Sequence, residues 1–340
     1  MRKLLNTLYV TRAETYLRRE GMDVVVSVEQ KDIFRIPIIN LDGIVAFGYM
    51  GVSPGLMKLC VDNNVLLTFM SPSGQYISRL QGASRGNVLL RKRQYRMSDD
   101  KEFCLSLARI IIAGKIQNSR NILRRAIRDN GENLRLEQAS EFLNRSAKNA
   151  LNVSTREELL GVEGDAANTY FGVFGELILR QKEEFKFNGR SRRPPRDEVN
   201  IMLSFIYTML ANEATSALES VGLDPYVGFL HALRPGRASL ALDMIEELRG
   251  YLADRLVLSM INRMQITKKD FIRQGTDMIL LSEEGRQKVI SAWQERKRET
   301  ITHPFLGEKM PLGIIWHIQA QLLSRYIRGD IENYPVFVMR

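Results

Sequence analysis

TYLRREGMDVVVSVE, residues 15–29, is the stretch that decides the fold of the first part of the chain. It contains two short runs, the second rich in valine, joined at Glu20-Gly21-Met22, and this pattern is typical of a β-hairpin. Further short apolar runs follow at residues 33–36, 43–47, 65–70 and 75–78. Ser53-Pro54 predicts one helix that extends to about Val61. Because strands this short need a second layer to bury their apolar face, we expect a small β-sandwich-like domain over residues 1–84.

The signals become helical after about Lys101. An apolar-periodic segment begins at Phe103, and a capping box at residues 154–157 predicts a helix that reaches about Lys182. Asp197 predicts the start of another helix, for which Gly222 is a natural C-terminal cap. Two more helices are expected, over residues 224–231 and from Ser239 to about Met264. The chain is therefore predicted to be α+β, with a basic linker at residues 85–100 and an all-α domain over residues 101–340.

The composition indicates the class of partner. The 340 residues include 49 Lys and Arg against 39 Asp and Glu, a net charge of +10, which favours nucleic acid or an anionic membrane surface. No apolar run approaches the ~20 residues of a spanning helix, and the N-terminus resembles a signal peptide only briefly. Cys60 and Cys104 lie in apolar surroundings, as reduced core cysteines of a cytoplasmic protein do. We expect a cytoplasmic protein with no membrane partner.

The sequence lacks a P-loop, a dinucleotide-binding glycine pattern, zinc-finger spacing and a G-x-S-x-G elbow. It does place His231, one of three histidines, shortly before a predicted helix that carries three carboxylates. Asp243 and Glu246 are three residues apart and neighbour each other on a helix face away from the apolar stripe. Considered alone, they fit a solvated acidic face, and His231 alone fits a hydrogen-bonded core histidine.

Glu163 adds a third element, because it lies on a predicted helix between glycine and alanine residues that allow close approach by a ligand or another helix. A glutamate, histidine and glutamate suit a divalent cation, and the imidazole favours Mn²⁺ over Mg²⁺. Such an ion activates a phosphodiester toward attack by a hydroxyl. Tyr170, two turns after Glu163, is either a packing residue or a ring that contacts a base or phosphate.

Arginines are concentrated in the Gly/Pro-containing loop before Asp197. The preferred DNA-contacting residues are Arg190, Arg192 and Arg193 in this loop, together with Arg237 between His231 and Asp243. Each alone is more often a solvated side chain, but with the net charge they favour a surface for the phosphate backbone.

Several motifs occur in an order that resembles a known family. They are EGDAANTY (163–170), RPPRDEVNIMLS (193–204), GLDPYVGFLH (222–231) and SLALDMIEELR (239–249). Together they resemble the CRISPR-associated endonuclease/integrase of the spacer-acquisition module, and GKIQNSR (114–120) is similar to its first long helix.

The resemblance implies a metal-dependent enzyme that joins the 3′-hydroxyl of a short DNA fragment to a CRISPR repeat and also cleaves DNA. Its metal ligands fall here on Glu163, His231 and Glu246, with Mn²⁺ or Mg²⁺ bound and Asp243 as a second acidic candidate. The last ligand is often aspartate in the family, so Glu246 is a departure. The implied partners are double-stranded DNA, a second copy of the chain and a small ferredoxin-like CRISPR adaptation protein. Two alternatives stay open: a non-catalytic nucleic-acid scaffold and a general metal-dependent nuclease.

Overall fold

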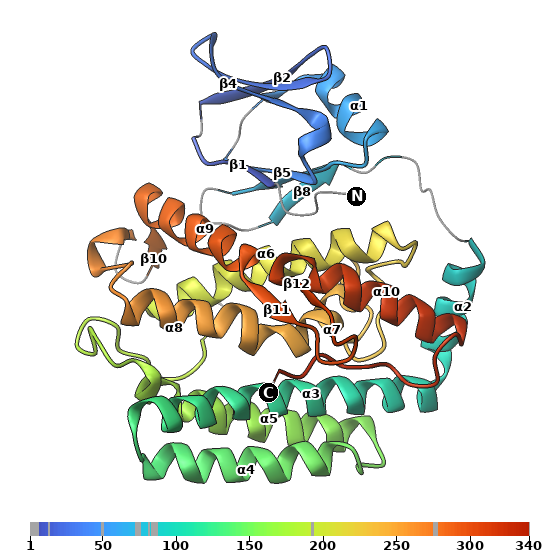
Figure 1. Cartoon of the computed structure of the whole chain (residues 1–340), viewed down its shortest axis with the longest axis vertical. Coiled ribbons are helices and arrows are strands. Elements are labelled where there is room, and N and C mark those ends of the chain that lie inside the picture. The colour runs from blue at the N-terminus through green and yellow to red at the C-terminus, as the bar shows by residue number, and fades with distance from the viewer. Residues whose placement is uncertain are drawn as a thin grey trace. The chain divides into compact units, whose positions relative to one another are not determined.

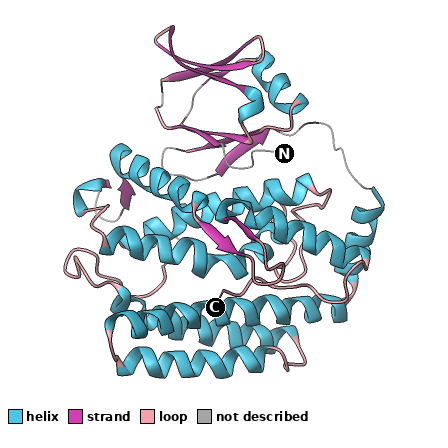
Figure 2. Ribbon diagram, viewed as in Figure 1, coloured by secondary structure: helices cyan, strands magenta, loops and turns pink. Residues whose placement is uncertain are grey.

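The computed structural model describes residues 7–12, 14–48, 51–71, 76–80, 82, 88–191, 194–274 and 278–339. The chain divides into two compact units, one comprising residues 1–85 and 297–299 and the other residues 86–296 and 300–340. Strands dominate the first unit and helices the second (Figure 2). The predicted α+β class is therefore confirmed. None of the helices in the described ranges is long and apolar enough to cross a membrane.

The described residues of the first unit form two four-stranded sheets and one α-helix, which can be followed in Figure 1. One sheet has the order β1-β5-β7-β8, with the first three strands parallel and β8 antiparallel to β7. The other has the order β4-β3-β2-β6. The elements are β1 (Thr7–Val10), β2 (Thr15–Glu20), β3 (Asp23–Val28), β4 (Lys31–Pro37), β5 (Gly43–Phe47), β6 (Gly51–Val52), α1 (Pro54–Asp62), β7 (Leu66–Met70) and β8 (Tyr76–Leu80).

The predicted hairpin is present as β2 and β3, which pair antiparallel across Gly21. Gly21 has φ of 60°, a left-handed conformation that glycine adopts without steric cost. Leu17 and Val24 from this sheet share one buried core with Ile44 and Leu67 from the other sheet. The two sheets thus bury their apolar faces in common, while the sandwich-like arrangement in detail stays a prediction.

The second unit is mainly helical. Its helices are α2 (Val88–Asp99), α3 (Lys101–Asn130), α4 (Leu134–Ala150), α5 (Arg156–Val173), α6 (Glu198–Ser220), α7 (Ser239–Leu248), α8 (Arg255–Asn262), α9 (Glu283–Arg298) and α10 (Ile315–Arg328). The long helix α3 packs against α4, α5 and α7. Helices α3, α4 and α5 lie side by side in Figure 1. This packing brings residues from distant parts of the sequence to one side of α3.

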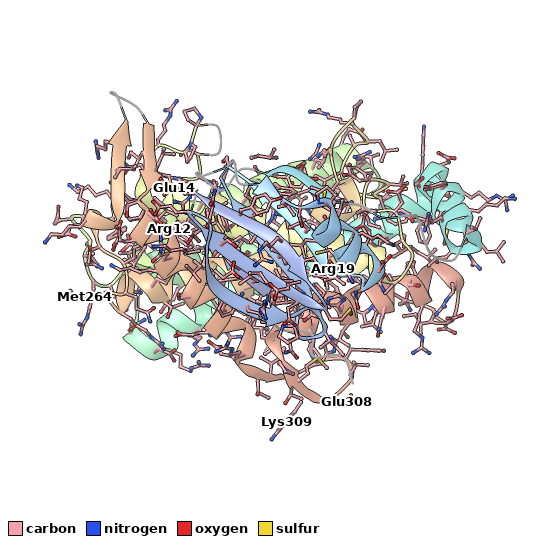
Figure 3. All side chains as sticks on the ribbon, turned by 90° about the horizontal axis from the view of Figure 1, so that it is seen from above. Arg12, Glu14, Arg19, Met264, Glu308 and Lys309 are labelled. Carbon is pink, nitrogen blue, oxygen red and sulfur yellow. The ribbon has the colours of Figure 1, made fainter. Side chains whose placement is uncertain are left out.

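The prediction of an all-α second domain is wrong, because this unit also contains two antiparallel strand pairs. They are β9 (Phe271–Gln274) with β10 (Met278–Leu281), and β11 (Thr300–Thr302) with β12 (Lys309–Pro311). The connection between β11 and β12 carries the exposed Glu308, beside Lys309 at the start of β12 (both labelled in Figure 3). These strands have three or four residues each, too few for a periodic signal in the sequence.

Residues 88–99, expected as part of a basic linker, form helix α2 of the second unit. Leu90 and Gln94 of this helix are buried at 2% and 0% exposure. The high charge of the segment favoured a linker, but two buried positions one turn apart are enough to dock the helix.

The predicted helix starts are largely correct. Ser53 caps α1 and Asp197 caps α6, each accepting a backbone amide hydrogen bond, and Gly222 follows α6 with φ of 85°. The capping box of α5 is formed by Thr155 and Glu158, one residue later than expected. Helix α5 ends at Val173 rather than near residue 182, followed by a 3₁₀ turn over Phe174–Leu177.

The helix expected from Ser239 to about Met264 is interrupted. Helices α7 and α8 are separated by a π-helical segment, η3 (Arg249–Asp254). Ser239, predicted to cap this helix, is its first residue; the N-cap position is Ala238, which has no capping side chain, and Ser239 Oγ donates to the carbonyl of Ala232. Segments of π-helix occur often at functional sites, and this one carries residues of the cluster described below.

Candidate metal centre

Residues 224–231, expected as a short helix, form turns that end at His231. Gln94 of α2 fixes their start, because its amide donates to the carbonyls of Asp224 and Val227 at 2.8 Å each and accepts from the amide of Asp224. Arg156 of α5 donates to the carbonyl of Leu230 near the end of the segment. The loop that carries His231 is therefore held from two different helices.

Asp243 of α7 explains why this loop is not helical. Its Oδ2 accepts the backbone amides of Phe229 and Leu230 at 2.6 and 2.9 Å, and its Oδ1 accepts the amide of His231 at 2.9 Å. A helix would direct these amides to carbonyls three or four residues earlier. Asp243 is fully buried, so the predicted solvated acidic face is wrong: the carboxylate needs the loop amides as partners once it is removed from water.

Gly228 allows the loop to approach α7 closely. A Cβ atom at this position would lie 2.6 Å from Asp243 Oδ2 and 2.8 Å from the carbonyl carbon of Ser239. Both distances are shorter than a carbon atom tolerates, so any larger residue must displace the loop or the carboxylate.

His231 is oriented by the same carboxylate. Its Nδ1 lies 2.7 Å from Asp243 Oδ1, and because that oxygen accepts, Nδ1 carries a proton; in the neutral form of the ring Nε2 then presents a lone pair. Nε2 faces Glu246 Oε1 at 3.7 Å. A carboxylate that orients a histidine through one ring nitrogen while the other faces a ligand site is common at metal centres.

Glu163 and Glu246 meet at a third residue, Lys115 of α3. The Lys115 Nζ pairs with Glu163 Oε1 and lies 2.8 Å from Glu246 Oε2. Glu246 is 3% exposed, compared with 25% for Glu163 and 16% for Lys115. The structure therefore brings the three predicted ligands together from α5, α7 and the loop before α7, with an ammonium group between the two glutamates.

Glu246 remains ionised in this environment. Burial alone would raise its pKa, but the positive charges of Arg249 and Lys115, with the nearby His231, lower the pKa to about 2. Arg249 Nη2 lies 3.0 Å from Glu246 Oε1. The other oxygen, Oε2, is buried without a hydrogen bond of good geometry, although Lys115 Nζ is close to it.

This donor set fits a hard divalent cation. It offers two carboxylates and an imidazole, and Nε2 of His231 and Oε1 of Glu246 face each other at 3.7 Å, a distance too long for a hydrogen bond. As the side chains stand, no group of three or more His, Cys, Asp or Glu residues within the described ranges is placed to hold a metal ion. Asp243 directs both oxygens to the loop and His231, so it is placed to position His231 and not to bind a metal.

A pocket lies beside this cluster and encloses about 510 Å³ of space, including its open mouth. Its lining includes Lys115, Glu163, Tyr170, Tyr207, Arg249 and Asp254. Both tyrosine hydroxyls donate to Asp254, from Tyr170 at 3.1 Å and from Tyr207 at 2.5 Å. Burial raises the pKa of Asp254 to about 6, and these two hydrogen bonds oppose that rise.

The geometry favours the packing alternative for Tyr170. Its side chain is 2% exposed, its hydroxyl is bound to Asp254, and its ring contacts that of Phe174 at 5.6 Å between centroids. The buried ring therefore has no exposed face on which a nucleic-acid base could stack.

Of the predicted DNA-contacting arginines, Arg192 and Arg193 lie outside the described residues. Arg190 donates to Asn200 Oδ1 at 2.7 Å and to Ser204 Oγ at 3.0 Å, so it ties its loop to α6. Arg237 is half-buried in the turn before α7, where its amide donates to the carbonyl of Arg234. A DNA-contacting role for these residues stays a prediction.

Sequence reasoning missed Lys115, Arg249 and Gln94 as parts of the site. Lys115 and Arg249 were noted only within longer motifs, and Gln94 lies in the segment expected as a linker. Arg249 is three residues after Glu246, a spacing that puts oppositely charged side chains next to each other on a helix. No local signal identifies Lys115 or Gln94, because their partners are 48 to 133 residues away in the sequence.

The sequence of this chain matches a known protein family. A family model described as "CRISPR associated protein Cas1" matches residues 8–295. The chain is 48% identical, over the full length of both proteins, to "CRISPR-associated endonuclease Cas1 1" of Chlorobaculum tepidum.

Two solved structures share the fold. A chain of a "Cas6-RT-Cas1--Cas2 complex" has a TM-score of 0.84 at 23% identity, covering 99% of this chain and 36% of that longer one. A "Casposase bound to integration product" has a TM-score of 0.83 at 23% identity, covering 98% of this chain and 94% of that one. The sequence matches decide the assignment: the chain belongs to the Cas1 family of CRISPR-associated proteins, which confirms the resemblance to the spacer-acquisition endonuclease and integrase.

Proposed function

We propose that this protein is a metal-dependent DNA endonuclease and integrase that inserts short DNA fragments as new spacers into a CRISPR array. The observation that carries the proposal is the convergence of Glu163, His231 and Glu246 on one point in a Cas1-family chain. These residues are up to 83 positions apart in the sequence, and a merely solvated acidic face would not bury Glu246 against a histidine and two cations.

The residues that hold the ion are proposed to be Glu163, Glu246 and Nε2 of His231, with Mn²⁺ or Mg²⁺ as the cation. When bound, the ion supplies Lewis-acid stabilisation of the charge that develops on the phosphodiester oxygens. Asp243 keeps the Nδ1 proton of His231 in place, so that Nε2 stays available as a ligand. Arg249 lies against Glu246 and contributes positive charge at the edge of the site.

In the joining reaction, the 3′-hydroxyl oxygen of the fragment bonds to phosphorus at the repeat boundary. The bond from that phosphorus to the leaving 3′ oxygen breaks, the attacking hydroxyl loses its proton to solvent, and the leaving oxygen gains one. The number of phosphodiester bonds is unchanged, so no external energy source is needed. Cleavage follows the same geometry with water as the attacking group.

The proposed partners are double-stranded DNA, a second copy of the chain and a small ferredoxin-like CRISPR adaptation protein. The net charge of +10 supports a polyanionic substrate. One solved structure with this fold is a complex that includes Cas2, and another is a casposase bound to an integration product, which supports DNA and a Cas2-type protein as partners. We expect the protein to act in the cytoplasm, where CRISPR arrays are found.

The test is a strand-joining assay with labelled DNA duplexes that carry free 3′-hydroxyl ends and a supercoiled plasmid that contains a CRISPR repeat. It is run with and without the small adaptation protein, in Mn²⁺, Mg²⁺ or excess chelator. Glu163→Gln, His231→Ala and Glu246→Gln are each expected to abolish joining and cleavage. Glu157→Gln, an exposed glutamate in the first turn of α5, is the matched control and should leave both activities unchanged.

Tryptophan fluorescence checks that each variant is folded. Joining that persists in chelator, or in all three ligand variants, would refute metal-dependent chemistry at this site. DNA binding without any joining or cleavage by the unaltered chain and its partner would favour the non-catalytic scaffold.

A further inference from the structure

Lys115 is in an unusual position for a site meant to hold a metal ion. Its ammonium contacts one oxygen of each glutamate that the proposed function assigns as a ligand, Glu163 Oε1 and Glu246 Oε2. The two carboxylates come from different helices, α5 and α7, and Lys115 comes from a third, α3. One positive group therefore lies between two negative groups and reduces the repulsion between them in a largely buried place.

The contact to Glu246 is incomplete. Its Oε2 is buried and lies 2.8 Å from the Lys115 nitrogen, yet the geometry does not amount to a hydrogen bond. This oxygen is shielded from water and lies against the ammonium, so the stability of its negative charge depends on that cation. A divalent cation that binds Glu246 would take over this role.

A metal ion that binds both glutamates must lie between them, since a divalent cation binds oxygen at about 2.0–2.6 Å. The Lys115 nitrogen contacts one oxygen of each glutamate, so an ion held by both glutamates and by Nε2 of His231 would lie close to the ammonium and repel it. Lysine has a flexible four-carbon stem, and its side chain is 16% exposed and lines the adjacent pocket. The ammonium can leave by side-chain rotation, without movement of α3.

We propose that Lys115 is an internal counter-cation that pairs with both metal-binding glutamates in the metal-free protein and is displaced when the divalent cation binds. This inference rests on the proposed function, because it takes Glu163 and Glu246 as metal ligands. It adds a role for a residue outside the ligand set: Lys115 stabilises the metal-free protein and weakens its affinity for metal.

The test measures Mn²⁺ binding directly by isothermal titration calorimetry, in the absence of DNA, so that it does not depend on activity. Lys115→Met keeps the length of the side chain and removes its charge. It is expected to bind Mn²⁺ at least tenfold more tightly than the unaltered protein and to melt at a lower temperature without metal. Lys115→Arg keeps the charge and should remain within about threefold of the unaltered affinity.

Lys148→Met, at an exposed position of α4, is the matched control and should not change the Mn²⁺ affinity. Lys115→Gln provides a second neutral variant if the methionine variant fails to fold. Adding Glu163→Gln to either neutral variant should remove the tight binding, which assigns the ion to this site.

Neutral variants that bind Mn²⁺ no more tightly than the unaltered protein would overturn the role of Lys115 while leaving the metal site intact. Absence of Mn²⁺ binding in the unaltered protein and in every Lys115 variant would overturn both the metal site and this inference. The two failures are therefore distinguishable in one series of titrations.

Discussion

Replacing Asp243 with asparagine is expected to destabilise the second unit strongly, although the substitution changes only one atom. The carboxylate accepts four hydrogen bonds, two at each oxygen, from three backbone amides and the His231 ring. Asparagine retains one oxygen, which still accepts hydrogen bonds. Its other terminal group is an amide NH₂, which cannot accept, so two of the four donors lose their acceptor. Because a hydrogen bond to a charged acceptor contributes about 1.5–3 kcal/mol, the two that are lost correspond to about 3–6 kcal/mol.

The assay is urea denaturation followed by tryptophan fluorescence. Both tryptophans of the chain, Trp293 and Trp316, are fully buried in the second unit, so their signal reports on that unit alone. Asp165→Asn, at an exposed position of α5, is the control and should change the free energy of unfolding by less than about 0.5 kcal/mol. A loss below about 1 kcal/mol for Asp243→Asn would refute the argument that this carboxylate holds the loop.

Two further predictions concern packing and thiol reactivity. Gly228→Ala should lower the stability of the second unit by about 1–3 kcal/mol in the same assay, because the added carbon meets Asp243 at 2.6 Å. Gly161→Ala, a helical position with no atom within 4 Å of the added carbon, should instead be neutral or stabilising, and equal effects at both glycines would contradict this account. Burial raises the thiol pKa of Cys60 to about 12 and that of Cys104 to about 11, so the reactive thiolate is scarce at mildly alkaline pH. Iodoacetamide should therefore modify neither cysteine until urea unfolds the chain, and rapid modification of the folded protein would show that the thiols are accessible.

Local signals in the sequence were sufficient wherever an element depends on its own residues. The hairpin of β2 and β3 follows from its valines and Gly21, and the starts of α1 and α6 follow from Ser53 and Asp197. In each case the deciding partners are within a few positions, so the pattern is visible without knowledge of the tertiary structure.

The sequence-based prediction was wrong where a residue distant in the sequence accepts hydrogen bonds from the backbone. Residues 224–231 carry the Asp-Pro start of a helix, but Asp243 accepts the amides that a helix would have used. Helix α5 was expected to continue past Val173, yet the amide of Leu179 donates to Asn262 at 2.8 Å. Competition of this kind depends on contacts between residues 12 to 83 positions apart in the sequence.

The residue types suggested a possible metal site, and the family resemblance assigned its ligands. Helical periodicity placed Asp243 and Glu246 on one face but favoured a solvated role for them, whereas the structure buries both. The family motifs pointed to Glu163, His231 and Glu246, and the structure brings these three side chains together around Lys115. The lysine could not have been predicted, because its position between the two glutamates results from the packing of α3 against α5 and α7.

The measurement that bears most directly on the proposed metal centre is a crystal structure of the protein grown with Mn²⁺, analysed by anomalous diffraction at the manganese edge. We predict an anomalous peak about 2.0–2.3 Å from Glu163, Glu246 and Nε2 of His231, with the Lys115 ammonium moved away from the two carboxylates. A fully ordered site with no manganese between these three side chains, or with manganese bound only elsewhere on the chain, would contradict the assignment.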